Sequence, residues 1–98
     1  MAIIKAVELD NGIVVSYHRV NVITNIVNNK TMIEVSSYIN KSKREQEKKA
    51  IENFEPMNVF IYTQIFNLDF DPEFSVTDAY NYLKSLDQFK GGEDDPSE

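Results

Sequence analysis

The chain has 98 residues, of which 42% are apolar and 11% are aromatic, so we expect one small globular core rather than disorder. It contains no cysteine, which excludes disulfides, thiolate nucleophiles and sulfur-ligated metal sites. Its net charge of −6 is uneven: residues 1–66 hold eight basic and seven acidic residues, whereas residues 67–98 hold two and nine. Because phosphate binding needs clustered Lys or Arg, the acidic C-terminal third disfavours direct binding of nucleic acid or an anionic membrane.

The first 39 residues predict a meander of three or four antiparallel strands. Two β-rich runs, 3–9 and 13–20, flank Asp10-Asn11-Gly12, and an Asn-Gly pair tolerates the positive φ angles of tight hairpins. The apolar pattern continues to Val27, and the turn residues 28–30 then precede a third strand over 31–39.

Residues 40–53 change abruptly to a charged segment in which five of the nine positions from Lys41 to Lys49 are basic. Ser42 and Glu45 have the spacing of a capping box, so the segment is either a short solvated helix or a charged loop. Acidic residues interleaved with the cations argue against an arm that grips a phosphate backbone.

The range 57–70 predicts the longest strand, and it is apolar on both faces. Val59, Ile61 and Ile65 share one face, and Phe60, Tyr62 and Phe66 share the other. Such a strand is either covered on both sides or committed to a partner chain, which raises self-association as a hypothesis.

An amphipathic helix is predicted over 76–89, because apolar residues recur at spacings of three and four after a capping box of Ser75 and Asp78. Gly91 is placed to end it. The expected fold class is therefore α+β: an antiparallel meander of four to five strands with one C-terminal helix. Residues 1–92 form the single domain, and residues 93–98 form a mobile acidic tail.

No catalytic or metal-binding constellation stands out, so we expect a protein that is not an enzyme and holds no cofactor or metal. Asp69, Asp71 and Glu73 alternate as in a calcium loop, but the glycine and the bidentate carboxylate of that loop are missing at the required spacing. His18 is the one histidine and has no evident partner, so it is predicted to lie at the surface or at a sheet edge.

The aromatic residues favour core packing or a protein interface over nucleobase stacking, because the aromatic-rich half is also the acidic half. The interface candidates are Tyr38, Phe60, Tyr62 and Phe66. An alternative hypothesis is an acidic surface that imitates nucleic acid and occupies a basic groove of a host protein. Its candidate residues are Asp87, Glu93, Asp94 and Asp95.

Three segments, MAIIKAVELDNGIVVSYHRV, VSSYINKSKREQEK and DAYNYLKSLDQFKGGEDD, together resemble small, largely uncharacterised proteins of tailed phages and prophages, particularly of Gram-positive hosts. Such proteins are encoded in late regions, near tail, baseplate or fibre genes. The resemblance covers nearly the whole chain and implies a setting, the virion or the host cytoplasm, but no catalytic residues.

The leading hypothesis is thus a non-enzymatic phage protein, a small tail or baseplate component or an assembly factor. Its partner would be a second copy or a phage structural protein, and it would form a homo-oligomer in the first case. The alternative is an inhibitor of a host defence or nucleic-acid enzyme. The N-terminus lacks the apolar run of a signal peptide, and no run approaches the roughly 20 residues of a membrane span, so a soluble protein without membrane contact is expected.

Overall fold

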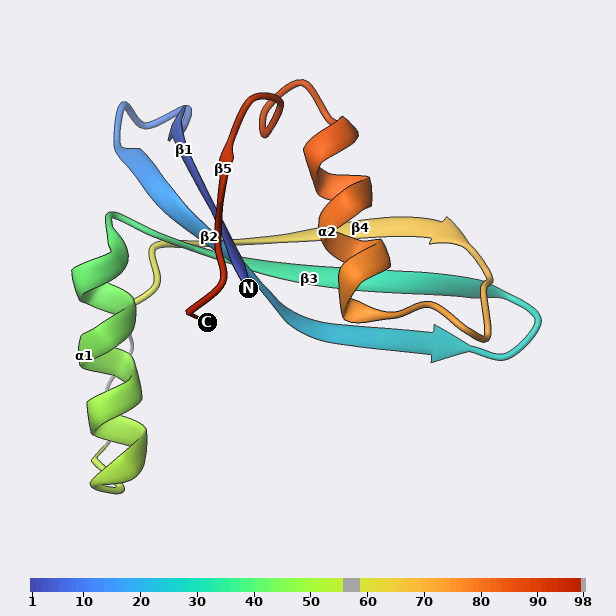
Figure 1. Cartoon of the computed structure of the whole chain (residues 1–98), viewed down its shortest axis with the longest axis horizontal. Coiled ribbons are helices and arrows are strands. Elements are labelled where there is room, and N and C mark those ends of the chain that lie inside the picture. Colours follow the sequence, from blue (N-terminus) through green and yellow to red (C-terminus); the bar gives the residue numbers. More distant parts are fainter. Residues whose placement is uncertain (56–58, 98) are drawn as a thin grey trace.

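The computed structural model describes residues 1–55 and 59–97, and within them the chain forms an α+β domain (Figure 1). The elements in chain order are β1 (Ala2–Glu8), β2 (Val14–Ile26), β3 (Lys30–Tyr38), α1 (Lys41–Glu52), β4 (Tyr62–Asp69), α2 (Val76–Ser85) and β5 (Glu93–Asp95). The strands make one antiparallel sheet in the order β4-β3-β2-β1-β5. The first four strands are therefore the predicted meander, and β5 adds to its β1 edge.

Both predicted hairpin turns are confirmed. Gly12 has a φ of +84°, and the Leu9 N–H donates to the Ile13 carbonyl at 2.8 Å, which closes the turn between β1 and β2. Asn28 has a φ of +57°, a conformation that Asn tolerates better than most residues, and it turns the chain between β2 and β3.

β2 is a single strand of 13 residues, longer than the run predicted for it. Its register on β3 shifts between Val20 and Val22, so Asn21 forms a bulge. The bulge lets Val20 and Ile23, three positions apart, contact the same core. The N–H of Val20 donates to the Tyr80 hydroxyl of α2 at 2.8 Å, so this backbone group is bonded at the bulge.

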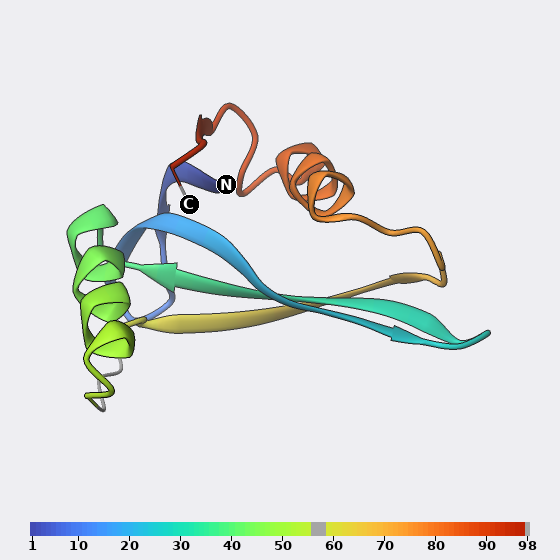
Figure 2. The ribbon, with the colours of Figure 1, turned by 60° about the horizontal axis from the view of Figure 1, so that its bottom comes forward.

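α2 covers one face of the sheet, here called the inner face, and Figure 2 shows it on one side of the curved ribbon. The buried core between them consists of Ile3, Ile33, Val35, Ala79, Tyr80, Leu83 and Phe89. The predicted capping box is present: the Ser75 N–H donates to the Asp78 carboxylate at 3.0 Å, and the Asp78 N–H donates to the Ser75 hydroxyl at 3.1 Å.

α2 ends earlier than predicted, at Ser85 instead of Phe89, because Leu86 is already extended. The turn that follows places the Phe89 ring in the core, 4.9 Å from the His18 ring. It then brings Gly92 so close to β1 that a Cβ atom there would lie 2.6 Å from Ile3 Cγ2. Glycine at this position therefore allows the chain to return to the sheet.

The predicted mobile acidic tail is wrong for residues 93–95, which form β5. Glu93 pairs with Ile4 and Asp95 pairs with Ala2, so the last acidic residues extend the sheet. The physical reason is that Asp95 is buried among hydrogen-bond donors, described below, and composition alone does not show such donors.

The charged segment is a helix, α1, and its N-cap is Asn40, whose side chain accepts from the Lys43 N–H at 3.2 Å. The predicted capping box with Ser42 as the N-cap is therefore wrong, because the helix begins two residues earlier.

β4 is shorter than the predicted strand over 57–70, and residues 56–58 lie outside the described part of the chain. Neither helix in the described part is long and apolar enough to cross a membrane.

Truncating the core residue Leu83 to Ala should lower the free energy of unfolding by about 2–5 kcal/mol, because Leu83 is fully buried between α2 and the sheet. The same helix provides a control, Val76→Ala, which removes an exposed side chain and should change stability by about 0.5 kcal/mol or less. Urea unfolding measures both, and equal losses would contradict this packing of α2.

Candidate functional site

The aromatic interface candidates lie in three different environments. Tyr38 is buried in a small second core with Ala2 and Tyr17, and Phe60 packs against that core. Phe66 contacts the main core, with its ring 6.2 Å from that of Tyr82. Of the four, Tyr62 is the one exposed side chain. Most of the predicted aromatic interface is therefore core.

Tyr38 fastens α1 to the sheet through its hydroxyl group. The hydroxyl donates to Glu47 at 2.7 Å and accepts from Arg19 Nε at 3.1 Å, and Glu47 also pairs with Arg44 of the same helix. Burial raises the pKa of Tyr38, as does its bond to Glu47, and Arg19 opposes the shift. The tyrosine therefore stays neutral at physiological pH and holds α1 as a hydrogen-bond donor.

Asp95 fastens β5 to the rest of the domain. Its carboxylate accepts from the Ser97 hydroxyl at 2.6 Å and the Tyr17 hydroxyl at 2.8 Å, and it pairs with Lys41 Nζ at 2.9 Å. These bonds, the Ser97 hydroxyl first, hold the pKa of Asp95 well below its ordinary value. The Tyr17 and Tyr38 rings meet edge to face at 6.4 Å, which joins the two sets of bonds on one side of the sheet.

The other acidic candidates do not gather into one array. Asp94 pairs with Lys84 at 3.0 Å. Asp87 follows α2 and Glu93 begins β5, and both are exposed without an ion pair to any described residue. Two of the four predicted acidic residues, Asp94 and Asp95, are thus already neutralised within the domain.

The prediction that His18 lies at the surface or a sheet edge is wrong, because the ring is buried in the middle of the sheet. Nε2 donates to the Lys5 carbonyl at 2.7 Å, and Nδ1 lies 2.7 Å from the Ser37 hydroxyl. Burial lowers the pKa of His18, although the bond to Lys5 opposes the shift. Sequence reasoning had no sign of these partners, which come from the neighbouring strands β1 and β3.

The described residues contain no group of three or more His, Asp or Glu side chains placed to hold a metal ion. In the acidic loop between β4 and α2, the Asp71 carboxylate accepts from the Glu73 N–H at 2.9 Å, and the Asp71 N–H donates to Thr31 Oγ1 at 3.0 Å. These residues therefore shape the loop that leads into α2.

A hollow of about 380 Å³ opens between the β1–β2 hairpin and the start of β4. Its lining residues are Val7, Glu8, Leu9, Asp10, Asn11, Ile61, Tyr62 and Gln88. The lining brings together two carboxylates, Glu8 and Asp10, and the side chain of Tyr62, and it contains no Ser, Lys or His.

The outer face, opposite α2, exposes several apolar side chains of neighbouring strands. We define it by two rows of cross-strand neighbours, Val22–Glu34–Ile65 and Thr24–Met32–Asn67, together with Ile26 at its end. Val22, Ile26 and Ile65 are 44%, 40% and 52% exposed, and an apolar hollow of about 80 Å³ lies among the first row and Met32. In Figure 2 no described element covers this side of the long ribbon.

The strand alternation predicted for β4 is consistent with this arrangement, but the side of the strand that lies exposed is the aliphatic one. Its aromatic side, with Phe66, packs beneath α2, and its aliphatic side, with Ile65, is left bare.

Comparison with protein-family models, with curated protein sequences and with solved structures gave no match. No family, relative or structural neighbour therefore indicates a function for this chain.

The single histidine gives a direct test of the buried site. We expect a proton NMR titration of His18 to give a pKa below its ordinary value of 6.5, because the folded state resists the buried positive charge. The unfolded state then binds more protons below about pH 6.5, so stability should fall as the pH drops through that value. A His18→Gln variant should lose this dependence, and a pKa at or above 6.5 would contradict the burial.

Asp95→Asn tests the attachment of β5. Because the folded pKa of Asp95 is depressed, its stabilising effect is present above the unfolded pKa of about 3.9 and is lost as the pH falls below it. Urea unfolding should show the variant less stable than the wild type at pH 7, with the difference shrinking toward pH 3. The control Asp94→Asn removes an exposed pair and should show a much smaller change at every pH.

Proposed function

We propose that the protein is not an enzyme and acts through protein–protein contacts made by the outer face. The single observation that carries this proposal is the bare, mainly aliphatic surface around Val22, Met32 and Ile65. Contiguous exposed apolar surface on a small domain is typical of an interaction site, since burying it against a partner removes it from water.

The surroundings of the outer face favour a protein partner. β4, which carries Ile65, is an edge strand, so its unpaired backbone groups lie beside the apolar surface. The one carboxylate within its two rows, Glu34, already accepts a bond from Asn21 at 2.9 Å. A partner that covers this face therefore meets one carboxylate among mainly apolar side chains and would have to supply a donor or a cation to it.

A second copy of the chain is the partner that we propose, within a tail or baseplate structure of a tailed phage or in its assembly. The phage setting rests on the resemblance of the sequence alone. It would place the protein in the virion or in the host cytoplasm. A structural protein of the same particle is the other partner of this class.

The alternative, an inhibitor that imitates nucleic acid, has weaker support. It needs a row of uncompensated negative charges, whereas Asp94 and Asp95 are paired with Lys84 and Lys41. Truncation after Gly92 would also remove β5 and its contacts with β1, so the double variant Asp87→Asn, Glu93→Gln is the appropriate test of this alternative.

The test of the proposal is the variant Ile65→Lys. Light scattering across a concentration series should show an oligomer for the wild type and a monomer for the variant, because the lysine places a charge in an apolar position of the outer face. The fold should tolerate the change, since Ile65 is half exposed and a lysine there would lie across from Glu34.

Ile13→Lys is the matched control, because Ile13 is similarly exposed in the β1–β2 connection, away from the outer face. It should keep the mass of the wild type. A wild type that stays monomeric at all concentrations, and captures no structural protein of the particle, would refute the proposal.

A further inference from the structure

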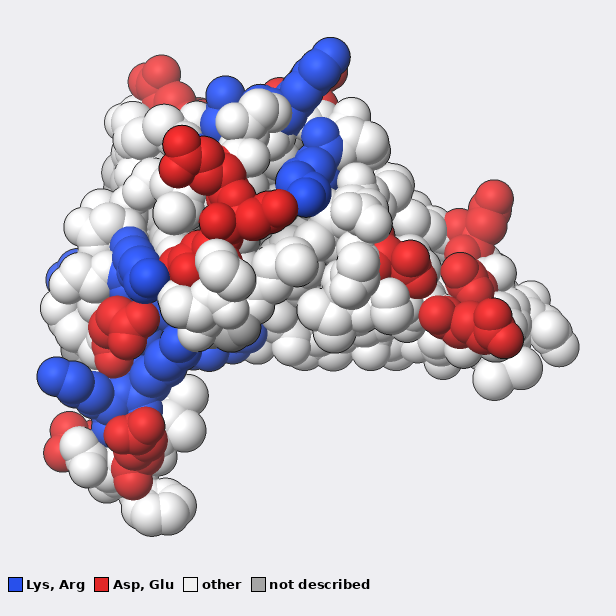
Figure 3. All heavy atoms as spheres, viewed as in Figure 1, with Lys and Arg blue, Asp and Glu red and all other residues white. Residues whose placement is uncertain are grey.

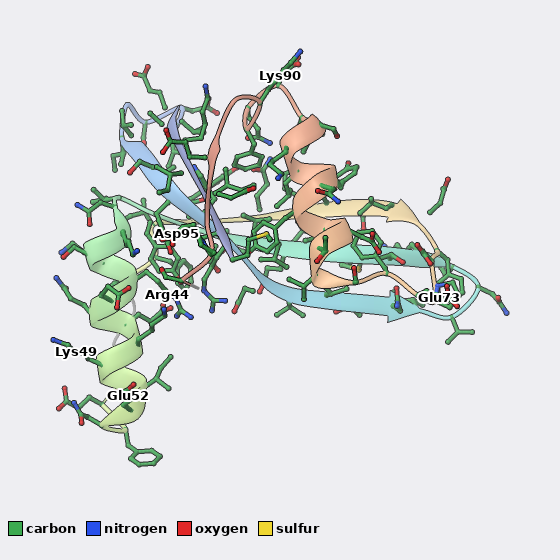
Figure 4. The ribbon with its side chains drawn as sticks, in the orientation of Figure 1. Arg44, Lys49, Glu52, Glu73, Lys90 and Asp95 are labelled. Carbon is green, nitrogen blue, oxygen red and sulfur yellow. The ribbon has the colours of Figure 1, made fainter. Side chains whose placement is uncertain are left out.

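The end of α1 carries an exposed apolar tip, which we define as Ile51 and Phe54. Their side chains are 62% and 95% exposed. α1 projects from the domain beyond one end of the sheet, as Figures 1 and 2 show, and Figure 4 places Lys49 and Glu52 far along this projection. The tip is therefore held away from the core on a rigid element.

The backbone at the tip is unusual for an aromatic residue. The Glu55 N–H donates to the Ala50 carbonyl at 2.8 Å and the Phe54 N–H donates to the Ile51 carbonyl at 3.2 Å, which is the Schellman pattern of a helix end. Phe54 occupies the position with positive φ, +55°, where Gly or Asn is usual. A bulky residue is strained there, and its exposed ring gains little packing in the domain that would offset this strain.

The two ends of the molecule carry opposite charge. α1 has five basic and three acidic residues, and Lys43 and Lys49 make no ion pair with any described residue. The opposite end, around the loop from β4 to α2, carries Asp69, Asp71 and Glu73, with Lys30 as its basic neighbour. Figure 3 shows blue atoms gathered over α1 and a red cluster at the far end of the ribbon.

We infer that the apolar tip of α1 docks on the outer face of a second copy, with the basic side of the helix turned toward that copy's acidic end. This inference rests on the proposed function and deepens it, because it names the surface that the outer face receives. In this contact the apolar tip would cover the apolar part of the outer face, and the basic side of α1 would lie near the acidic loop between β4 and α2.

The contact joins two different copies, because α1 and the acidic end of the ribbon lie at opposite ends of one molecule (Figure 4). It also joins two different surfaces, so it is heterologous. Repetition of a heterologous contact closes into a ring when the rotation permits and otherwise extends into a filament.

The variant Phe54→Asn removes the ring and puts at this position a residue that accepts a positive φ. The thermal midpoint should stay the same or rise, so any loss of assembly cannot be attributed to unfolding. Light scattering should show the mass of one chain, 11.3 kDa, where the wild type gives a multiple of it. Ile13→Asn, which removes an exposed apolar side chain elsewhere, is the matched control and should assemble as the wild type does.

Mixing two variants tests whether the contact is heterologous. Phe54→Asn keeps an intact outer face, and Ile65→Lys keeps an intact tip, so each alone should be monomeric. An equimolar mixture should form pairs of twice the chain mass and nothing larger, because a single productive contact remains between the two variants.

The other outcomes separate the inference from the proposed function. If Ile65→Lys is monomeric and Phe54→Asn still assembles, the outer face binds something other than the tip, which overturns the inference and leaves the proposed function standing. If both variants and their mixture are monomeric, the contact is not heterologous and the inference is overturned. An Ile65→Lys variant that assembles overturns both. A monomeric wild type overturns the inference, and it overturns the proposed function as well when it captures no structural protein of the particle.

Discussion

The rest of this structure depends on one constraint: the chain has a single helix available to cover the long part of a sheet that is apolar on both sides. α2 buries the inner face through Tyr80 and Leu83. α1 is almost wholly polar and meets the sheet at its end, beside Tyr38, so it cannot cover the outer face as well. A domain of 98 residues therefore folds with one aliphatic surface left over.

Hydrogen bonds and ion pairs outside the main core attach α1 and β5 to the sheet. Glu47 and Asp95 are nearly buried carboxylates, and each is matched by a tyrosine hydroxyl and a basic side chain. Removing either partner would leave a charge with too few donors, which is costly in a desolvated position. These bonds fix the direction in which α1 projects and keep β5 on the sheet, so they determine which surfaces the molecule presents.

The sequence was sufficient for elements that are specified locally. The turns at Gly12 and Asn28 and the capping box of Ser75 depend on residues within a few positions of one another. It was insufficient where partners are distant in the chain. His18 is buried by groups from β1, β3 and the turn after α2, and Asp95 is ordered by Tyr17, 78 positions away. The strained φ of Phe54 likewise has no signature in composition.

The charge pattern bears on how two copies of a chain with an aliphatic outer face could associate. Two outer faces brought together would oppose the Glu34 carboxylates of the two copies, in a chain whose net charge is −6. Five of the ten basic residues lie on α1, which ends at the tip formed by Ile51 and Phe54. Association through the tip brings unlike charges together, so the same distribution that disfavours face-to-face contact favours an ordered head-to-tail one.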